Sequence, residues 1–262
     1  MKTKIFYFTG TGNTLKLAKD LANELENVEL IKISYKMDFE QSDCDIAGIA
    51  YPVYCFGLPN IVVNFIKQVN FKQGAYIFGL SSYGALLTNS GKILNKKLKE
   101  RGYNLSAGFA IQMPGNATTV YNVPKLEKRE KFYAIEQDKI KKIAEIIKNK
   151  KTYKIETTLS FLGKLMSGIS SKMMSNINSV GKSFFIDENC DGCGICKDIC
   201  PVKNIKMKDN KPEWLNKCES CLACFHWCPK FSIQGNEKTK TRGRYHHPDI
   251  VLEDMLCLKS HY

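Results

Sequence analysis

Eight of the 11 cysteines lie between positions 190 and 228, in two runs of the same spacing. Each run reads C-x2-C-x2-C-x3-C-P, and the runs end at Cys200-Pro201 and Cys228-Pro229. Three cysteines two residues apart can wrap one short loop around a cubane iron–sulfur cluster, whose ligands are thiolates. The fourth cysteine follows a helical turn and, in two-cluster proteins, ligates the other cluster. The doubled run therefore predicts two [4Fe–4S] clusters.

The spacing also predicts crossed ligation. The expected ligands of the first cluster are Cys190, Cys193, Cys196 and Cys228. The expected ligands of the second cluster are Cys200, Cys218, Cys221 and Cys224. One alternative is a pair of zinc sites, but such sites usually show two C-x2-C pairs with a longer gap between them. The other is a disulfide knot, which a reducing compartment disfavours.

A second chemical signal follows the first apolar run of the chain, in a loop of small and hydroxylated residues. The loop consists of Thr9, Gly10, Thr11, Gly12, Asn13 and Thr14. Small residues let the backbone turn tightly and aim N–H groups at a phosphate over a helix N-terminus. The threonine hydroxyls and the Asn13 amide add uncharged donors. The loop lacks the Gly-Lys of a P-loop, and Leu15 stands where a dinucleotide fingerprint needs its third glycine. A tight strand-to-helix turn with a threonine cap is the alternative.

The letters T-G-T-G-N-T resemble the phosphate-binding loop of flavodoxins, which implies FMN. Ligands of such sheets gather at the carboxyl ends of the central strands. There, two later loops carry an aromatic residue that can stack on an isoalloxazine ring, and 113–116 can touch the same ring. Simple loop packing is the alternative role of these aromatics. The residues expected to contact the flavin are Pro52, Val53, Tyr54, Cys55, Phe56, Gly57, Ser81, Ser82, Tyr83 and Gly84.

Strands and helices are expected to alternate over the first part of the chain, which predicts a parallel sheet covered on both faces. The expected strands are Lys4–Phe8, Val28–Ile33, Ile46–Tyr51, Ala75–Leu80 and Ser106–Ile111. Helices are expected after the first loop, from Ser90, and from about Glu130 to Lys150. An apolar stripe from Leu162 to Met173 predicts a bridging helix between two domains.

The cysteine segment resembles a bacterial two-cluster ferredoxin, and the whole chain, including the tail at Gly243–Pro248, is similar to the fused flavodoxin–ferredoxin family. This resemblance implies a flavodoxin-like, doubly wound α/β sheet of five parallel strands in the order 2-1-3-4-5, followed by a small α+β domain. It also implies FMN and two [4Fe–4S] clusters in one electron-transfer chain. The expected units are 1–155, a linker at 156–180, the cluster domain at 181–237 and a tail at 238–262.

Composition limits the function classes. The net charge of +13 suits an acidic protein partner, nucleic acid, an anionic membrane surface or a solubilising shell. No apolar run approaches the ~18 residues of a membrane span, and Ile5–Phe8 is too short for a signal-peptide core of ~7 or more. A cytoplasmic protein without a transmembrane segment is therefore expected.

No nucleophile elbow, paired carboxylates or Ser-His-Asp pattern is present, so no acid–base catalyst is assigned and the chemistry is expected to be that of the cofactors. The leading hypothesis is an electron-transfer protein that links one-electron carriers to a two-electron acceptor. Its expected partners are redox proteins, such as an acidic ferredoxin or a flavoenzyme. A flavin-dependent reductase of a small substrate is the alternative. A redox-sensing nucleic-acid binder is a third class, disfavoured because no DNA-binding motif is present. His226 and Trp227 are expected to shield a cluster, and His246-His247 to lie at a surface or an interface.

Overall fold

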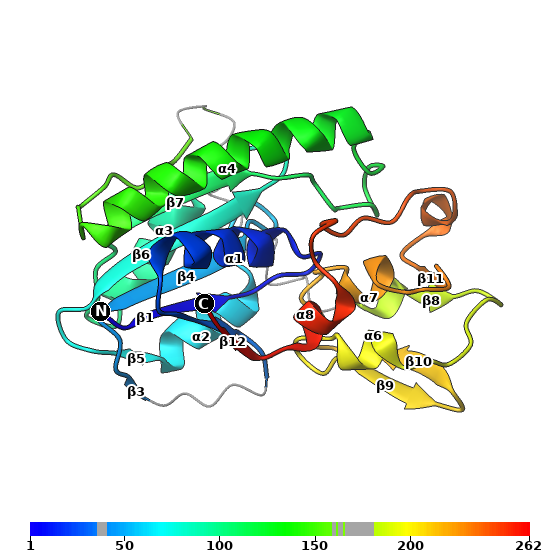
Figure 1. Cartoon of the computed structure of the whole chain (residues 1–262). Helices are drawn as coiled ribbons and strands as arrows, with labels where there is room; N and C mark the ends of the chain where they lie inside the picture. Colours follow the sequence, from blue (N-terminus) through cyan, green and yellow to red (C-terminus); the bar gives the residue numbers. More distant parts are fainter. Residues whose placement is uncertain (36–40, 159–160, 162–164, 166–180) are drawn as a thin grey trace.

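The computed structural model describes residues 1–35, 41–158, 161, 165 and 181–262. Its centre is a sheet in which five parallel strands lie in the order β2-β1-β4-β6-β7 (Figure 1). The strands are β1 (Thr3–Tyr7), β2 (Val28–Lys32), β4 (Ile46–Pro52), β6 (Tyr76–Tyr83) and β7 (Ala107–Gln112). This is the flavodoxin-like order, and the expected α/β fold is confirmed.

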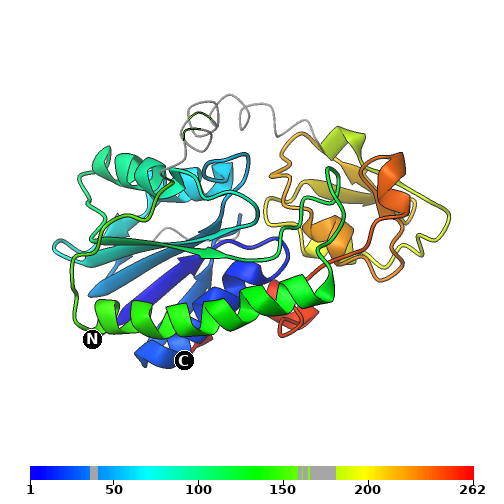
Figure 2. The same cartoon turned by 90° about the horizontal axis from the view of Figure 1, so that it is seen from above.

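Helices cover both faces of the sheet, as Figure 2 shows. One face carries α1 (Asn13–Leu25) and α4 (Leu126–Lys148), which pack against each other. The other face carries α2 (Asn60–Gln68) and α3 (Ser90–Lys99). Every residue of β4 is buried, as expected of a parallel strand covered on both sides. Helix α2 was not predicted, although its buried Ile61, Val62, Phe65 and Ile66 recur at helical spacing.

The cysteine-rich part lies beside the carboxyl ends of these strands and contains short elements only. A hairpin pairs β9 (Ile205–Lys208) with β10 (Lys211–Trp214), and a second antiparallel pair joins the distant strands β8 (Phe185–Ile186) and β11 (Ile233–Gln234). The helices of this part include α6 (Ile195–Asp198), α7 (Ala223–His226) and the 3-10 helix η2 (Glu237–Lys240). A further two-residue pair, β3 (Gln41–Ser42) and β5 (Asn70–Phe71), lies in the first part. None of the helices within the described residues is long and apolar enough to cross a membrane.

The end of the chain returns to the large sheet, which the sequence did not predict. After α8 (Leu252–Leu256), strand β12 (Lys259–His261) pairs antiparallel with β2 and covers that edge of the sheet. The red segment in Figure 1 shows this path from the cysteine-rich part back to the sheet. The tail is therefore built into the α/β part.

Other boundaries differ from expectation in ways that affect the candidate site. Strand β6 runs to Tyr83, so that Ser81-Ser82-Tyr83, expected in a loop, belong to the strand. Helix α4 begins at Leu126, four residues before the expected start. The expected bridging helix, with its stripe from Leu162 to Met173, falls mainly outside the described residues.

The interface between α1 and α4 contains a buried carboxyl group. Glu136 is 1% exposed, and burial together with the neighbouring Asp20 raises the pKa of Glu136 to about 8. An unfolded Glu titrates near ~4.3. Protonated Glu136 therefore contributes fully to the free energy of unfolding below that pH. This contribution is lost progressively as the pH rises toward 8.

Glu136→Gln is expected to remove this loss, because the amide has no proton to lose. The variant should be more stable than the wild type at pH 8 by on the order of 1–3 kcal/mol, with the difference vanishing near pH 4.5. Thermal unfolding across this pH range measures it, with the exposed Glu145→Gln on the same helix as control. A pH-independent difference would contradict the prediction.

Candidate functional site

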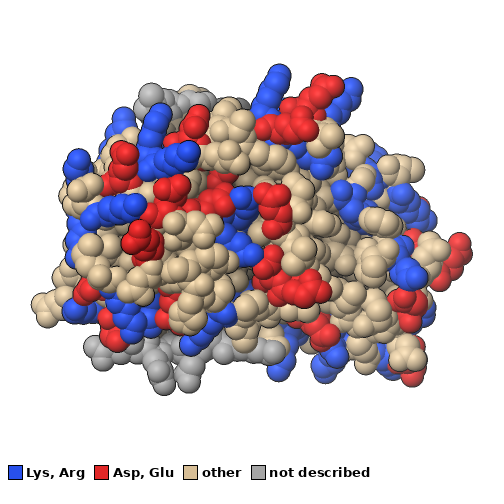
Figure 3. Space-filling view, viewed as in Figure 1, with Lys and Arg blue, Asp and Glu red and all other residues tan. Residues whose placement is uncertain are grey.

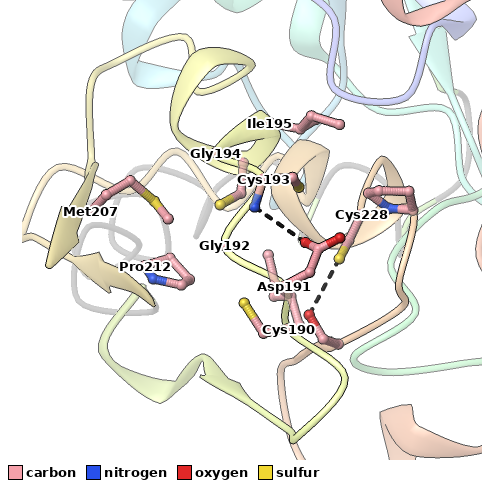
Figure 4. Close-up of a pocket in the computed structure, with 13 residues that line it drawn as sticks. Cys190, Asp191, Gly192, Cys193, Gly194, Ile195, Met207, Pro212 and Cys228 are labelled. Atoms are coloured by element: carbon pink, nitrogen blue, oxygen red, sulfur yellow. Dashed lines mark hydrogen bonds between the residues drawn. The ribbon is translucent and has the colours of Figure 1, made fainter. Parts of the chain in front are cut away.

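The first cysteine cavity collects sulfurs from two distant segments. It is lined by Cys190, Cys193, Cys196 and Cys228 (Figure 4). The last cysteine of the second run thus lies with the first three cysteines of the first run. Met207 and Pro212 of the β9–β10 hairpin line the same cavity. The Cys193 N–H donates to Asp191 Oδ1 at 3.1 Å, which holds the turn between the first two cysteines.

The second cavity has the reciprocal set of sulfurs, from Cys200, Cys218, Cys221 and Cys224. The two loops also share their backbone conformation. Gly192 and Gly194 have φ near +78° and +79°, and the equivalent Ser220 and Leu222 of the second run have φ of +51° and +58°. A left-handed conformation is uncommon for such side chains and costs on the order of 1 kcal/mol or more. The second loop therefore tolerates strain to form the same wrap as the first.

Burial makes these thiols poor acids in the absence of a metal. It raises the pKa of Cys196 and of Cys218 to about 11, and it raises the pKa of Cys221 and Cys224 as well. Ligation requires thiolates, so a positively charged metal centre must offset this cost. The two four-sulfur cavities fit a cubane in donor type, number and position. Within the described residues, no three His, Cys, Asp or Glu side chains converge closely enough to hold a single metal ion.

A third cavity, of about 380 Å³, lies at the carboxyl ends of β1, β4 and β6. This volume falls within the range of small-molecule sites, roughly 300–1,000 Å³. The expected residues that line it are Thr9, Gly10, Thr11, Asn13, Thr14, Pro52, Val53, Tyr54, Cys55, Phe56, Ser82, Tyr83 and Gly84.

Three expected residues do not line this cavity, for reasons visible in the backbone. Gly12 has φ +90° at the start of α1, where the Ile250 side chain packs against it. Gly57 closes the turn after β4, since its N–H donates to the Tyr54 carbonyl at 2.8 Å. Ser81 lies within β6 and donates its hydroxyl to the Phe109 carbonyl at 3.1 Å. All three lie behind residues that line the third cavity.

The loop 9–14 keeps hydroxyl donors available to the cavity. Thr9 Oγ1 accepts the Gly12 N–H at 3.1 Å, and Thr11 Oγ1 accepts Asn116 Nδ2 at 3.0 Å, which leaves each hydroxyl proton free to donate. Thr14 Oγ1 pairs with Ser82 Oγ at 2.7 Å. The Tyr54 hydroxyl is buried and has no hydrogen-bond partner within the described part of the chain. These uncharged donors suit an anionic phosphate and a polar ring.

The third cavity adjoins the second cysteine loop. Ser220 and Leu222, which flank Cys221, line it together with the loop 9–14. A Cβ added to Gly10 would lie 2.3 Å from the Cys221 carbonyl oxygen, so the two backbones touch. Trp227 Nε1 donates to the Gly10 carbonyl at 3.2 Å. Glu219 of the same loop is also buried, which raises its pKa to about 7.

Sequence reasoning missed part of the lining. The missed residues are Ala85, Leu86, Ala117, Thr119, Val120, Tyr121, Ser220 and Leu222. The segment Met113–Asn116, expected to touch the ring, does line the cavity. The missed residues within 117–121 follow this segment directly in sequence, and that position was the only local signal that they line the cavity.

The histidines, Trp227 and the cysteines outside the two runs have defined positions in the structure. His226 is 2% exposed, its Nε2 lies 2.9 Å from the Asn116 carbonyl, and burial lowers its pKa to about 4. His247 is buried, whereas the ring of its neighbour His246 stacks on Trp227 at 4.2 Å. His226 and Trp227 were expected to shield a cluster, but they line neither cysteine cavity and instead contact Asn116 and Gly10, which line the third cavity. Cys55 is half-buried in the third cavity, Cys44 is buried and Cys257 is exposed.

Comparison with known proteins identifies the cysteine-rich part. Residues 175–233 match a family described as a 4Fe–4S dicluster domain. An uncharacterized polyferredoxin-like protein of Methanocaldococcus jannaschii is 38% identical, over 18% of this chain and 37% of its own. The chain thus spans little more than a third of the curated relative it matches.

Solved structures match the α/β part at low identity. A flavoprotein of Bacteroides uniformis is 16% identical with a TM-score of 0.39, covering 55% of this chain and 97% of that one. Streptococcus pneumoniae flavodoxin is 17% identical with a TM-score of 0.38, covering 55% and 96%. Rubredoxin:oxygen oxidoreductase of Desulfovibrio gigas is 22% identical with a TM-score of 0.40, covering 57% and 36%.

The cysteine motif and the family match identify residues 175–233 as similar to a 4Fe–4S dicluster domain. The strand order adds the second feature. The chain thus joins an α/β part with the flavodoxin-like strand order to a part that matches a 4Fe–4S dicluster domain, and its sequence resembles the fused flavodoxin–ferredoxin family.

Gly10→Ala is expected to disturb the contact between the two parts, because the added methyl group would collide with the Cys221 carbonyl. Such overpacking typically costs about 1–3 kcal/mol. Thermal unfolding measures the loss, and Gly243→Ala, whose added Cβ meets Val123 at an ordinary 3.5 Å, is the control. Equal stability of the two variants would contradict the tight backbone contact.

Proposed function

We propose that this protein relays electrons between two [4Fe–4S] clusters and FMN, and so links one-electron carriers to a two-electron acceptor. When bound, the clusters exchange single electrons and the flavin holds one or two. The protein's task is then to hold these groups close together and to keep water and competing reactions away. One observation carries this proposal: the loop around Cys221 lines both the second cysteine cavity and the third cavity.

The cysteine cavities support the crossed assignment of ligands. Cys190, Cys193, Cys196 and Cys228 would hold the first cluster, and the second would bind to Cys200, Cys218, Cys221 and Cys224. Backbone donors near the second set suit a negatively charged cluster, because the Asn204 N–H lies 3.2 Å from Cys200 Sγ and the Ser220 N–H lies 3.3 Å from Cys218 Sγ.

The third cavity supports FMN with its phosphate at the loop 9–14. That loop provides hydroxyl and N–H donors at the start of α1, where the helix dipole favours an anion. The ring would lie between the β4 loop, with Tyr54, and the end of β6, with Tyr83. Gly84 packs close to Gly115, since a Cβ at Gly84 would lie 3.1 Å from the Gly115 Cα. The named flavoproteins among the structural matches agree with this choice.

The positions of the cavities also suggest an order of transfer. Cys193 is exposed and Cys190 is half-buried, so the first cysteine cavity lies near the surface. Cys218 and Cys221 are buried, and the second cavity adjoins the third. Electrons from a partner would enter at the first set of cysteines, pass the second and reach the flavin, or take the reverse path.

The surface charge bears on the choice of partner. Figure 3 shows Lys and Arg side chains interleaved with Asp and Glu on one face. The net charge of +13 nevertheless favours acidic redox proteins over basic ones. A free ferredoxin of the acidic kind is the proposed partner, and the basic segments Lys92–Arg101 and Lys125–Lys151 are the proposed source of steering.

The crossed ligation predicts which pairs of cysteine variants should have the same EPR spectrum. Anaerobic protein should contain about eight iron and eight sulfide per chain. Cys200→Ala should reproduce the EPR spectrum and iron loss of Cys221→Ala. Likewise, Cys228→Ala should reproduce those of Cys193→Ala. The reason is that each pair removes a ligand from the same cluster.

The exposed Cys257→Ala, outside both cavities, is the matched control and should keep the full iron content. If Cys200→Ala instead resembles Cys193→Ala, the ligands are not crossed. Stoichiometric zinc without iron in protein prepared anaerobically from iron-replete cells would end the cluster proposal.

Stopped-flow reduction by an acidic ferredoxin tests the relay. Cluster bands should bleach first and flavin bands should follow, because the flavin cavity adjoins the second cysteine loop. The bimolecular rate should fall as salt rises, since the Debye length is ~10 Å at 0.1 M. A rate independent of salt would remove the steering claim. A flavin that stays oxidised beside reduced clusters, despite a favourable measured potential, would remove the relay.

A further inference from the structure

We propose that Trp227 and the C-terminal segment Tyr245–Ile250 are part of the flavin phosphate site, and hold the loop 9–14 from the side opposite the cavity. This inference rests on the proposed FMN site. It assigns positioning residues that lie more than 200 positions away from the loop they hold.

Contacts from the C-terminal half fall on consecutive residues of the loop. Trp227 Nε1 donates to the Gly10 carbonyl at 3.2 Å, and the His247 N–H donates to the Thr11 carbonyl at 2.9 Å. Tyr245 donates its hydroxyl to Asn13 Oδ1 at 2.6 Å. The remaining residue, Gly12, has the Ile250 side chain against its Cα, where a Cβ would lie 3.0 Å from Ile250 Cβ.

These contacts determine which way the loop's N–H groups point. In a planar trans peptide, the carbonyl and the following N–H point in opposite directions. A Gly10 carbonyl held by Trp227 therefore turns the Thr11 N–H away from the C-terminal half and toward the cavity. A Thr11 carbonyl held by His247 likewise turns the Gly12 N–H toward Thr9 Oγ1, which lines the cavity.

The side chain of Asn13 is fixed at both ends. Its Oδ1 accepts from Tyr245 and its Nδ2 donates to the Pro114 carbonyl at 2.9 Å, so the first residue of α1 is tied to the tail and to a cavity wall. The amide thus holds the loop, and the second Nδ2 hydrogen is left for the phosphate contact that the sequence predicts. A preorganised loop binds its ligand more tightly, because less ordering remains to be done on binding.

The holding residues are themselves immobilised. Tyr245, His247 and Ile250 are each at most 2% exposed. The Tyr245 N–H donates to His226 Nδ1 at 3.0 Å, and Arg244 stacks over the Phe225 ring at 3.4 Å. The segment is thus attached to Phe225 and His226 of helix α7, which lie between Cys224 and Cys228 in sequence, before it reaches the loop. Burial of apolar residues alone would not require the three hydrogen bonds that Trp227, Tyr245 and His247 donate to this one loop.

Binding of FMN and of riboflavin by the full-length protein tests the proposal, because riboflavin lacks the phosphate. Tyr245→Phe removes only the hydroxyl on Asn13 and Tyr133. It should weaken FMN binding about two- to tenfold, as expected for one lost hydrogen bond, and leave riboflavin binding unchanged. Fluorescence titration measures both, and the cluster absorption should not change.

Tyr76→Phe is the matched control, since it removes one buried hydroxyl that donates to the Lys151 carbonyl, away from the cavity. Trp227→Phe is the second variant and should also lower FMN affinity without affecting riboflavin. Unchanged FMN affinity in both variants would overturn the proposal, and so would an equal loss for the two flavins. Wild-type protein that binds neither flavin would overturn the proposed function itself.

Discussion

The contact between the Gly10 backbone and the Cys221 carbonyl determines how the two parts of this protein meet. It is possible only because position 10 has no side chain, as any Cβ would lie 2.3 Å from that oxygen. Through it, the loop after β1 and the second cysteine loop become two walls of one cavity. The cysteine-rich part consists of short elements and gains support from its contact with the α/β part.

The path of the chain secures this contact. The tail leaves η2, passes Tyr245 and His247, and ends as β12 in the large sheet. His226 links three segments at the junction, because its two ring nitrogens contact the Asn116 carbonyl and the Tyr245 N–H. Both contacts need a neutral ring with a proton on Nε2 only. The low pKa of His226, about 4 and caused mainly by burial, keeps the ring in that form at neutral pH.

The sequence was most informative where chemistry needs fixed local spacing. The doubled cysteine run and the loop 9–14 are such patterns, and the alternation of apolar strands and helices predicted the sheet. Contacts between distant segments left no local pattern: Ser220 and Leu222 reach the third cavity only because the parts dock. Strand β12 is short and polar, and its pairing is set by the open edge of β2. Comparison of the two cysteine runs would have suggested left-handed backbone at Ser220 and Leu222, since glycines occupy the equivalent positions.

Docking also makes the two cysteine sites unequal, although their loops share one backbone conformation. Cluster potentials depend on hydrogen bonds to the sulfurs, on burial and on solvent. The first site has the exposed Cys193, while the second has the buried Cys221 and backbone donors near Cys200 and Cys218. Burial disfavours added negative charge and N–H donors favour it, so these effects oppose each other at the second site. In the proposed relay, position would set the order of transfer, because the second site, unlike the first, shares a lining residue with the third cavity. The potentials would then set the direction of transfer.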